Sequence, residues 1–303
     1  MRKSILIIIL SVAGLCLATC SNQKTSRAQA SDVANVADET DLPLPAVPDS
    51  LGSTEERAAY MALHFWDAMD WKDHSQSLDT AFVEQNFANY LTVLPLADTA
   101  SRAEAVRHLV TCAEADGAAL AFLAETVSKY LYDPNSPMRD EELYILFARR
   151  MLGSGMLDDA GRMRMEAYLE EAVKNRPGSR AADFAYITRG GEKATLHTTA
   201  PGRTLLLIFY DPDCTHCAET IGRLGNDAEI IRQIDEGSLA VLSVYPDDNT
   251  DLWQSTTGTL PDRWIVGRAE SPDDISDLYS IPATPVIYLL DPNRRVIAKD
   301  IKL

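Results

Sequence analysis

Hydrophobic positions follow two different patterns in the two halves of the chain. Over residues 53–176 apolar side chains recur at the three- and four-residue spacing of amphipathic helices, and β-branched runs are almost absent. The pattern predicts a bundle of about six helices in a domain covering residues 51–176. The first helix is expected to carry an apolar face made of Ala58, Met61, Ala62, Phe65 and Met69. The later helices are expected at 80–94, 101–115, 120–131, 140–152 and 159–174. Breaks between them are expected at Pro95, Gly117, Pro134, Gly153 and Pro177.

From residue 177 onward the apolar positions form short continuous runs instead. Runs at 204–210, 238–245 and 286–290 have the length and composition of strands that are buried on both faces of a sheet. An amphipathic stretch that begins at Ala218 follows the first run. The alternation predicts an α/β domain over residues 177–303.

The sequence Cys214-Thr215-His216-Cys217 lies between that first apolar run and the amphipathic stretch. A cysteine at a helix N-terminus meets unpaired backbone N–H groups and the positive end of the helix dipole, which favour thiolate over thiol. Cys214 is therefore the predicted nucleophile. Cys217 lies one helical turn further and is predicted to resolve a mixed disulfide on Cys214.

Other chemistries of a CxxC pair fit the sequence less well. A four-cysteine zinc site needs a second pair, whereas only Cys112 remains outside the N-terminal segment, and covalent haem attachment needs histidine where Ala218 stands. A peroxidatic cysteine would follow a threonine at the position of Asp211, so a thiol peroxidase is a minor alternative. His64, His74, His108 and His197 show no metal-ligand spacing with a carboxylate or thiol, so neither a metal nor another cofactor is predicted.

Residues 178–303 resemble thioredoxin-like proteins of the TlpA/ResA class. The resemblance rests on the CxxC motif together with the sequence Ile281-Pro282-Ala283-Thr284-Pro285 ahead of an apolar run. It implies a first strand at 181–184, a central strand at 205–210 and further strands at 238–245 and 286–290. It also implies that the Thr284-Pro285 bond is cis, faces the dithiol and shapes a groove for an extended protein substrate.

Three departures from that family pattern bear on mechanism. Ile208 occupies the position of the buried acid of many thioredoxins, so Cys217 must exchange its proton through another group. Asp211 and Asp213 oppose a thiolate, whereas His216 and Thr215 are candidates to stabilise it by charge or hydrogen bonding. The chain ends after an expected last strand at 295–301, without the usual covering helix, so the helical domain is expected to pack on the sheet or its flanking helices.

The N-terminal segment predicts the compartment. Arg2 and Lys3 precede an apolar stretch at 5–17 that suits a signal peptide, and Leu17-Ala18-Thr19-Cys20 resembles a lipoprotein processing box with Cys20 as the lipidated residue. Cleavage at Ala28-Gln29-Ala30 is the alternative. A lipoprotein signal peptide (1–20) and a disordered tether (21–50) would place the protein in the cell envelope, facing the periplasm. The net charge of −17 argues against nucleic acid as a partner.

The sequence of the helical domain indicates less about function than that of the α/β domain. Its stretch 64–71 resembles an uncharacterised domain that precedes thioredoxin-like domains in some bacterial envelope lipoproteins, while Trp66, Trp71 and Cys112 are expected in its core. The leading hypothesis is a lipid-anchored thiol-disulfide oxidoreductase acting on protein dithiols and disulfides with a redox partner. A non-catalytic protein that uses a thioredoxin-like platform to bind a partner remains the alternative.

Overall fold

The computed structural model describes residues 41–301, so Cys20, the predicted signal peptide and residues 21–40 of the predicted tether lie outside the described residues. Asp41 and Leu42, within the predicted tether, contact the helices, contrary to the prediction for these two residues. Leu42 is buried, and its backbone N–H donates a 2.8 Å hydrogen bond to Asn86 Oδ1. Asn89 Nδ2 donates to Asp41 Oδ1 at 3.2 Å. One apolar side chain and two amide partners therefore attach this segment.

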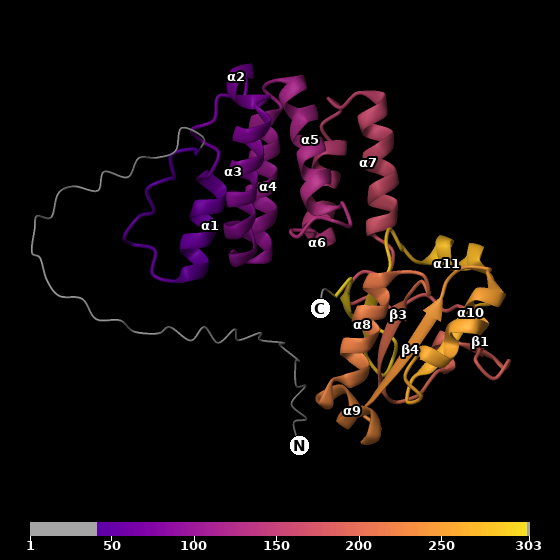
Figure 1. Cartoon of the computed structure of the whole chain (residues 1–303). Helices are drawn as coiled ribbons and strands as arrows, with labels where there is room; N and C mark the ends of the chain where they lie inside the picture. The colour runs from indigo at the N-terminus through magenta and orange to yellow at the C-terminus, as the bar shows by residue number, and fades with distance from the viewer. Residues whose placement is uncertain (1–40, 302–303) are drawn as a thin grey trace, which may run out of the picture. The chain divides into compact units, whose positions relative to one another are not determined.

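The helical region confirms the predicted all-α bundle (Figure 1). Aspartates cap most of the helices, because a side-chain oxygen at the N-cap accepts hydrogen bonds from the free N–H groups of the first turn. Gly117 begins a helix rather than breaking one, since Asp116 caps it. The helices are α1 (Thr54–His64), α2 (His74–Ser77), α3 (Thr80–Val93), α4 (Thr99–Ala113), α5 (Gly117–Leu131), α6 (Glu141–Leu152) and α7 (Asp159–Ala172).

The first helix is shorter than its apolar pattern predicts. It ends at His64, and Phe65, Trp66, Met69 and Trp71 fill the core of the bundle from the turn that follows. Trp66 and Trp71 are therefore core residues, with ring centroids 5.6 Å apart. None of the helices in residues 41–301 is long and apolar enough to cross a bilayer.

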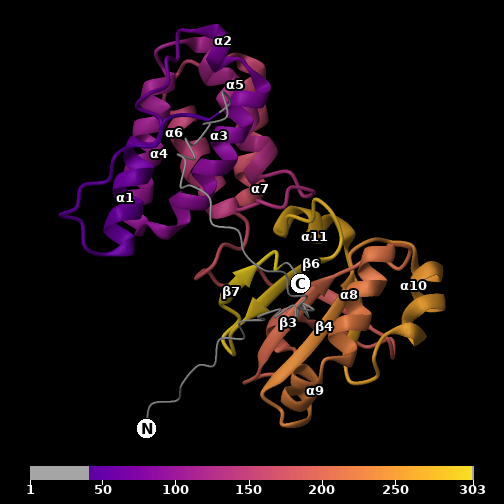
Figure 2. The same ribbon diagram turned by 60° about the vertical axis from the view of Figure 1, so that its left-hand side comes forward.

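Residues 177–301 form an α/β domain around a seven-stranded mixed sheet. The strands are β1 (Ala185–Thr188), β2 (Lys193–Thr195), β3 (Thr204–Phe209), β4 (Leu239–Tyr245), β5 (Ile265–Ala269), β6 (Val286–Leu290) and β7 (Val296–Lys299), in the order β2-β1-β5-β4-β3-β6-β7. Figure 2 shows β7, β6, β3 and β4 in this order across the sheet. β3, β4 and β5 are parallel, while β6 runs antiparallel to β3. The predicted first strand at 181–184 is wrong, because β1 begins at Ala185.

The α/β domain covers both faces of its own sheet. Helices α8 (Thr215–Asn226), α9 (Ala228–Asp235) and α10 (Thr250–Thr256) pack on one face. On the other face α11 (Pro272–Leu278) and the segment 181–184 enclose the rings of Phe184, Phe209 and Tyr279. No hydrophobic cluster of the described residues mixes the helical region with the α/β domain. The expectation that the helical domain packs on the sheet is therefore wrong. Its expected contact with a flanking helix is present, because Lys174 and Asn175 donate hydrogen bonds to the Ser276 and Leu278 carbonyls of α11.

The two regions meet instead through polar contacts at the edge of the sheet. Arg139, just before α6, pairs with Glu141 at 2.5 Å and with Asp300 at 2.7 Å, and Lys299 pairs with Glu141 at 2.6 Å. The side chains of Arg139, Glu141 and Lys299 are each less than one-tenth exposed. Asn175 Nδ2 also donates to the Leu278 carbonyl at 2.8 Å. A buried ionic network therefore joins the helical region to β7.

Candidate active site

Cys214 lies where the central strand turns into a helix. After β3, Asp211 organises the turn: its carboxylate accepts the Asp213 N–H at 2.8 Å and its carbonyl accepts the Cys214 N–H at 3.2 Å. Cys214 is the N-cap of α8, and its sulfur accepts the Cys217 backbone N–H at 3.2 Å. The thiol thus takes the position that a serine or aspartate oxygen fills at other helix starts. This is the placement that the sequence predicts.

The two cysteines have opposite environments. Partial burial acts to raise the pKa of Cys214, but hydrogen bonds from the Cys217 thiol and backbone N–H, from Thr284 and from the His216 backbone outweigh it and lower the pKa. Cys217 is almost fully buried, and this burial raises its pKa to about 11. Neither cysteine is in a disulfide. One thiol is therefore accessible and acidic, and the other is shielded and protonated.

The proline loop lies directly against the nucleophile. Residues Phe209 and Val286 are paired in the antiparallel register of β3 and β6, so the residues just beyond them meet at one edge of the sheet. The Cys214 thiol donates to the Thr284 carbonyl at 3.5 Å, and the Thr284-Pro285 peptide bond is cis as predicted. The loop and the dithiol thus form one continuous surface.

The side chains between the cysteines do not touch the sulfur. His216 is exposed, and its Nδ1 lies 3.9 Å from Glu219 Oε2. Thr215 is also exposed, and within the described residues its hydroxyl forms no hydrogen bond with either sulfur. The predicted stabilisation by the imidazole or the threonine hydroxyl has no contact to support it. The Cys217 thiol, backbone N–H groups of α8 and Thr284 supply the stabilisation instead.

Proton exchange at Cys217 also follows from its neighbours. Ile208, at the position of the missing acid, is fully buried, and the nearby Tyr210 phenol has its pKa raised by burial, so it remains neutral. No signal in the sequence pointed to Tyr210. In the reduced chain the Cys217 thiol donates its hydrogen bond to the Cys214 sulfur. The proton that Cys217 loses in the resolving step must go elsewhere, because that sulfur is then the one under attack.

Each of the four histidines considered as metal ligands lies beside a carboxylate in the structure. Asp67 binds His64 Nδ1 at 2.7 Å and His108 Nε2 at 2.9 Å, and the Cys112 sulfur lies 3.7 Å from the same His108 nitrogen. Burial, together with the Asp67 charge, raises the pKa of Cys112, which therefore stays a thiol. In the described part of the chain no group of three or more such side chains is arranged to hold a metal ion.

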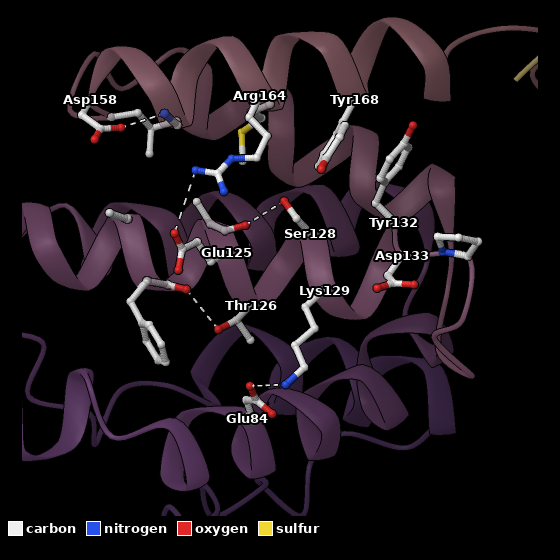
Figure 3. A pocket seen from close by; sticks show the side chains of 17 residues that line it. Glu84, Glu125, Thr126, Ser128, Lys129, Tyr132, Asp133, Asp158, Arg164 and Tyr168 are labelled. Carbon is white, nitrogen blue, oxygen red and sulfur yellow. Dashed lines mark hydrogen bonds and ion pairs between the residues drawn. The ribbon is translucent and has the colours of Figure 1, made fainter. Parts of the chain in front are cut away.

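A hollow of about 540 Å³ in the helical region offers no reactive group (Figure 3). It lies among α3, α5 and α7. Lys129 Nζ reaches Glu84 at 2.6 Å, and Arg164 approaches Glu125 at 4.0 Å, so charges of opposite sign are paired along its wall. The rings of Tyr132 and Tyr168 stack at one end, with centroids 4.4 Å apart. The dithiol is therefore the better candidate for chemistry.

Comparisons with known proteins agree with this architecture. Residues 19–175 match the model of a family described as a domain of unknown function, DUF5106. A crystal structure of a thioredoxin-like protein from Bacteroides caccae is 34% identical, with a TM-score of 0.81 over 86% of this chain and 94% of that one. The chain therefore belongs to the DUF5106 family. Its two parts are a DUF5106 helical domain and a thioredoxin-like domain, as the sequence predicts.

Other solved structures match the C-terminal part of this DUF5106 protein. The C-terminal domain of an uncharacterized protein from Bacteroides fragilis is 35% identical over 43% of this chain and 94% of that one, with a TM-score of 0.41. A thiol-disulfide oxidoreductase from Bacteroides fragilis is 22% identical over 41% and 91%, with a TM-score of 0.36. No curated protein matches the chain.

Proposed function

We propose that this DUF5106 protein is a thiol-disulfide oxidoreductase that exchanges disulfides with protein substrates through Cys214 and Cys217. The observation that carries the proposal is the asymmetry of the pair: hydrogen bonds from the Cys217 thiol and from helix N–H groups lower the pKa of the accessible sulfur, while burial raises the pKa of the other to about 11. A structural pair of cysteines needs no such difference. An exchange reaction does, because the two thiols act in sequence.

In the reducing direction the Cys214 thiolate attacks one sulfur of a partner disulfide. A mixed disulfide forms, the partner's S–S bond breaks, and one partner sulfur leaves as a thiolate that takes a proton from solvent. Cys217 then loses its proton, attacks the Cys214 sulfur and releases the second partner thiolate. The chain ends with a Cys214–Cys217 disulfide, and two electrons have passed to the partner. A dithiol protein would return the chain to its reduced form by the reverse steps.

The groove for the partner is proposed at the proline loop. The Thr284 carbonyl already accepts a hydrogen bond from the nucleophile, so backbone groups of this loop are within reach of a chain bound to Cys214. An extended segment that adds alongside Thr284 and Pro285 would place its cysteine at the sulfur. Thr215 and His216 lie at the rim, where they can touch a partner without touching the thiolate.

The location is proposed from the N-terminal sequence. The basic start, the apolar stretch and the Leu-Ala-Thr-Cys box support export and lipidation at Cys20. Lipidation would attach the protein to an envelope membrane facing the periplasm, where its partners would be envelope proteins. Metabolic labelling with a lipid precursor tests this: the native chain should take up label, and a Cys20→Ala chain should not.

Trapping of mixed disulfides tests the catalytic proposal. In a Cys112→Ser background, Cys217→Ser should accumulate mixed disulfides with a reducible protein such as oxidised insulin, because the resolving thiol is gone. Cys214→Ser should trap none, since Cys217 is shielded. If both variants trap equally, or the double-cysteine chain does not react with any protein disulfide, the domain is a binding platform rather than an enzyme.

A further inference from the structure

The groove beside the dithiol is lined by negatively charged side chains. A cavity of about 620 Å³ adjoins the proline loop and shares Asp211 and Thr284 with the candidate active site. Its wall also carries Tyr245, Asp247 and Asp273 from the α/β domain. Among the described residues that line it there is no lysine, arginine or histidine. This cavity beside the proline loop is therefore walled by acidic residues and has no cation in its lining.

The sheet topology explains why these carboxylates meet. Asp211 follows β3, Asp247 follows β4 and Asp273 lies in the first turn of α11, after β5. Because the three strands are parallel and adjacent, the residues after them lie at one edge of the sheet. Cys214 lies at the same edge. The arrangement therefore places three carboxylates and the nucleophile along one line of loops.

These carboxylates are not neutralised within the chain. The Asp211 carboxylate accepts the Asp213 N–H, and the Asp247 carboxylate accepts the Asp248 N–H, both at 2.8 Å. These hydrogen bonds fix the position of the two carboxylates without cancelling their charge. None of the three forms an ion pair in the part of the chain that the structure describes. Burial first, then Asp247 and Asp211, raise the pKa of the Tyr245 phenol, so both carboxylates act on the same point. A fourth carboxylate on the wall, Glu171, is offset by Lys174 at 2.5 Å.

We propose that this groove selects a polypeptide segment that carries lysine or arginine beside its cysteine, with the cation meeting Asp211 and Asp247. The inference rests on the proposed function and names the chemistry of its substrate. Opposite charge raises the rate of encounter, and like charge at the same point lowers it. The unpaired carboxylates thus favour cationic disulfides over anionic ones, and they would do so without a change in the nucleophile itself.

Three small disulfides of similar size and different charge test the proposal: cystamine (dication), bis(2-hydroxyethyl) disulfide (neutral) and 3,3′-dithiodipropionate (dianion). The full chain with Cys112→Ser is reduced and mixed with each, and every rate is divided by the rate of the same disulfide with 2-mercaptoethanol. We expect the cation-to-anion ratio of these normalised rates to be at least about tenfold at low salt. It should fall towards one in roughly 0.5 M salt, where the screening length is about 4 Å.

Charge variants locate the effect. Asp211→Asn with Asp247→Asn should reduce the cation-to-anion ratio at least about threefold, whereas Asp159→Asn with Glu166→Gln, which makes the same change of charge on α7, should leave it unchanged. A ratio near one in the parent chain, or equal loss in both pairs of variants, would overturn the inference while leaving the proposed function intact. No reaction with any of the three disulfides would instead refute the proposed function.

Discussion

The difference between the two cysteines gives a prediction that can be worked out in numbers. A thiol with a pKa near 9 is about 1% thiolate at pH 7, and the lowered pKa of Cys214 gives it a larger thiolate fraction than this. Burial raises the pKa of Cys217 to about 11, which leaves on the order of 0.01% thiolate. The thiolate populations therefore differ by at least about 100-fold.

A difference in intrinsic nucleophilicity offsets part of that difference in thiolate population. A thiolate of higher pKa is intrinsically more nucleophilic, and a Brønsted slope of about 0.45 returns roughly a factor of 8 over two pKa units. The net advantage of Cys214 is then at least about 10-fold, before the shielding of the buried sulfur is counted. Shielding can only increase it, because Cys217 is 1% exposed.

Alkylation kinetics measure this advantage directly. Two chains in a Cys112→Ser background, one with Cys217→Ser and one with Cys214→Ser, are treated with iodoacetamide from pH 6 to 11. Cys214 should react at least about 10-fold faster at pH 7, with a midpoint below that of an ordinary thiol, and the rate at Cys217 should still rise above pH 10. Rates within about threefold of each other at pH 7, or a lower midpoint for Cys217, would refute the assignment of nucleophile and resolving thiol.

The remaining predictions concern stability, measured by denaturant unfolding. Arg139→Met should cost about 1–3 kcal/mol, because Glu141 and Asp300 each lose a hydrogen-bond partner while Glu141 keeps Lys299. Leu42→Ala should cost about 2–3 kcal/mol, whereas Leu44→Ala, 65% exposed, should change stability by less than about 0.5 kcal/mol. In α8, Gly222→Ala should stabilise by about 0.5–1 kcal/mol, since its new Cβ meets nothing, while Gly225→Ala should destabilise because Pro261 Cγ would lie 2.7 Å from the Cβ.

Each of these has an outcome that contradicts it. A cost below about 1 kcal/mol for Arg139→Met would mean that solvent reaches the network and that it acts as a surface ion pair. Equal effects of Leu42→Ala and Leu44→Ala would restore the interpretation of residues 41–50 as a free tether. A stabilising Gly225→Ala would show that α8 does not pack closely on the loop that carries Pro261.

Features set by local chemistry were predictable from the sequence. Aspartate caps begin the helices, continuous apolar runs became β3, β4 and β6, and a cysteine at the end of a strand became the N-cap of α8. The cis bond before Pro285 followed from the resemblance of the proline loop. In each case the residues that determine the feature are neighbours in the chain.

Features set by tertiary packing were not predictable in this way. Leu42 is a single apolar residue in a polar stretch, and only the Asn86 amide, far along the chain, shows why it is held. Likewise, α11 and the segment 181–184 cover the face of the sheet for which a terminal helix was expected. Neither segment has an apolar periodicity that would have identified it in the sequence. The acidic groove could not be predicted without the order of β3, β4 and β5, because that order brings Asp211 and Asp247 together.

A redox titration of the dithiol tests the central claim most directly. The full chain with Cys112→Ser is equilibrated with glutathione buffers of stepped potential, quenched by alkylation, and analysed by mass spectrometry. We predict one reversible two-electron transition to an intramolecular Cys214–Cys217 disulfide, in which the ratio of oxidised to reduced chain changes tenfold for about 30 mV. Glutathione adducts on the separate cysteines with no intramolecular disulfide, or a dithiol that stays reduced across the whole range, would contradict it.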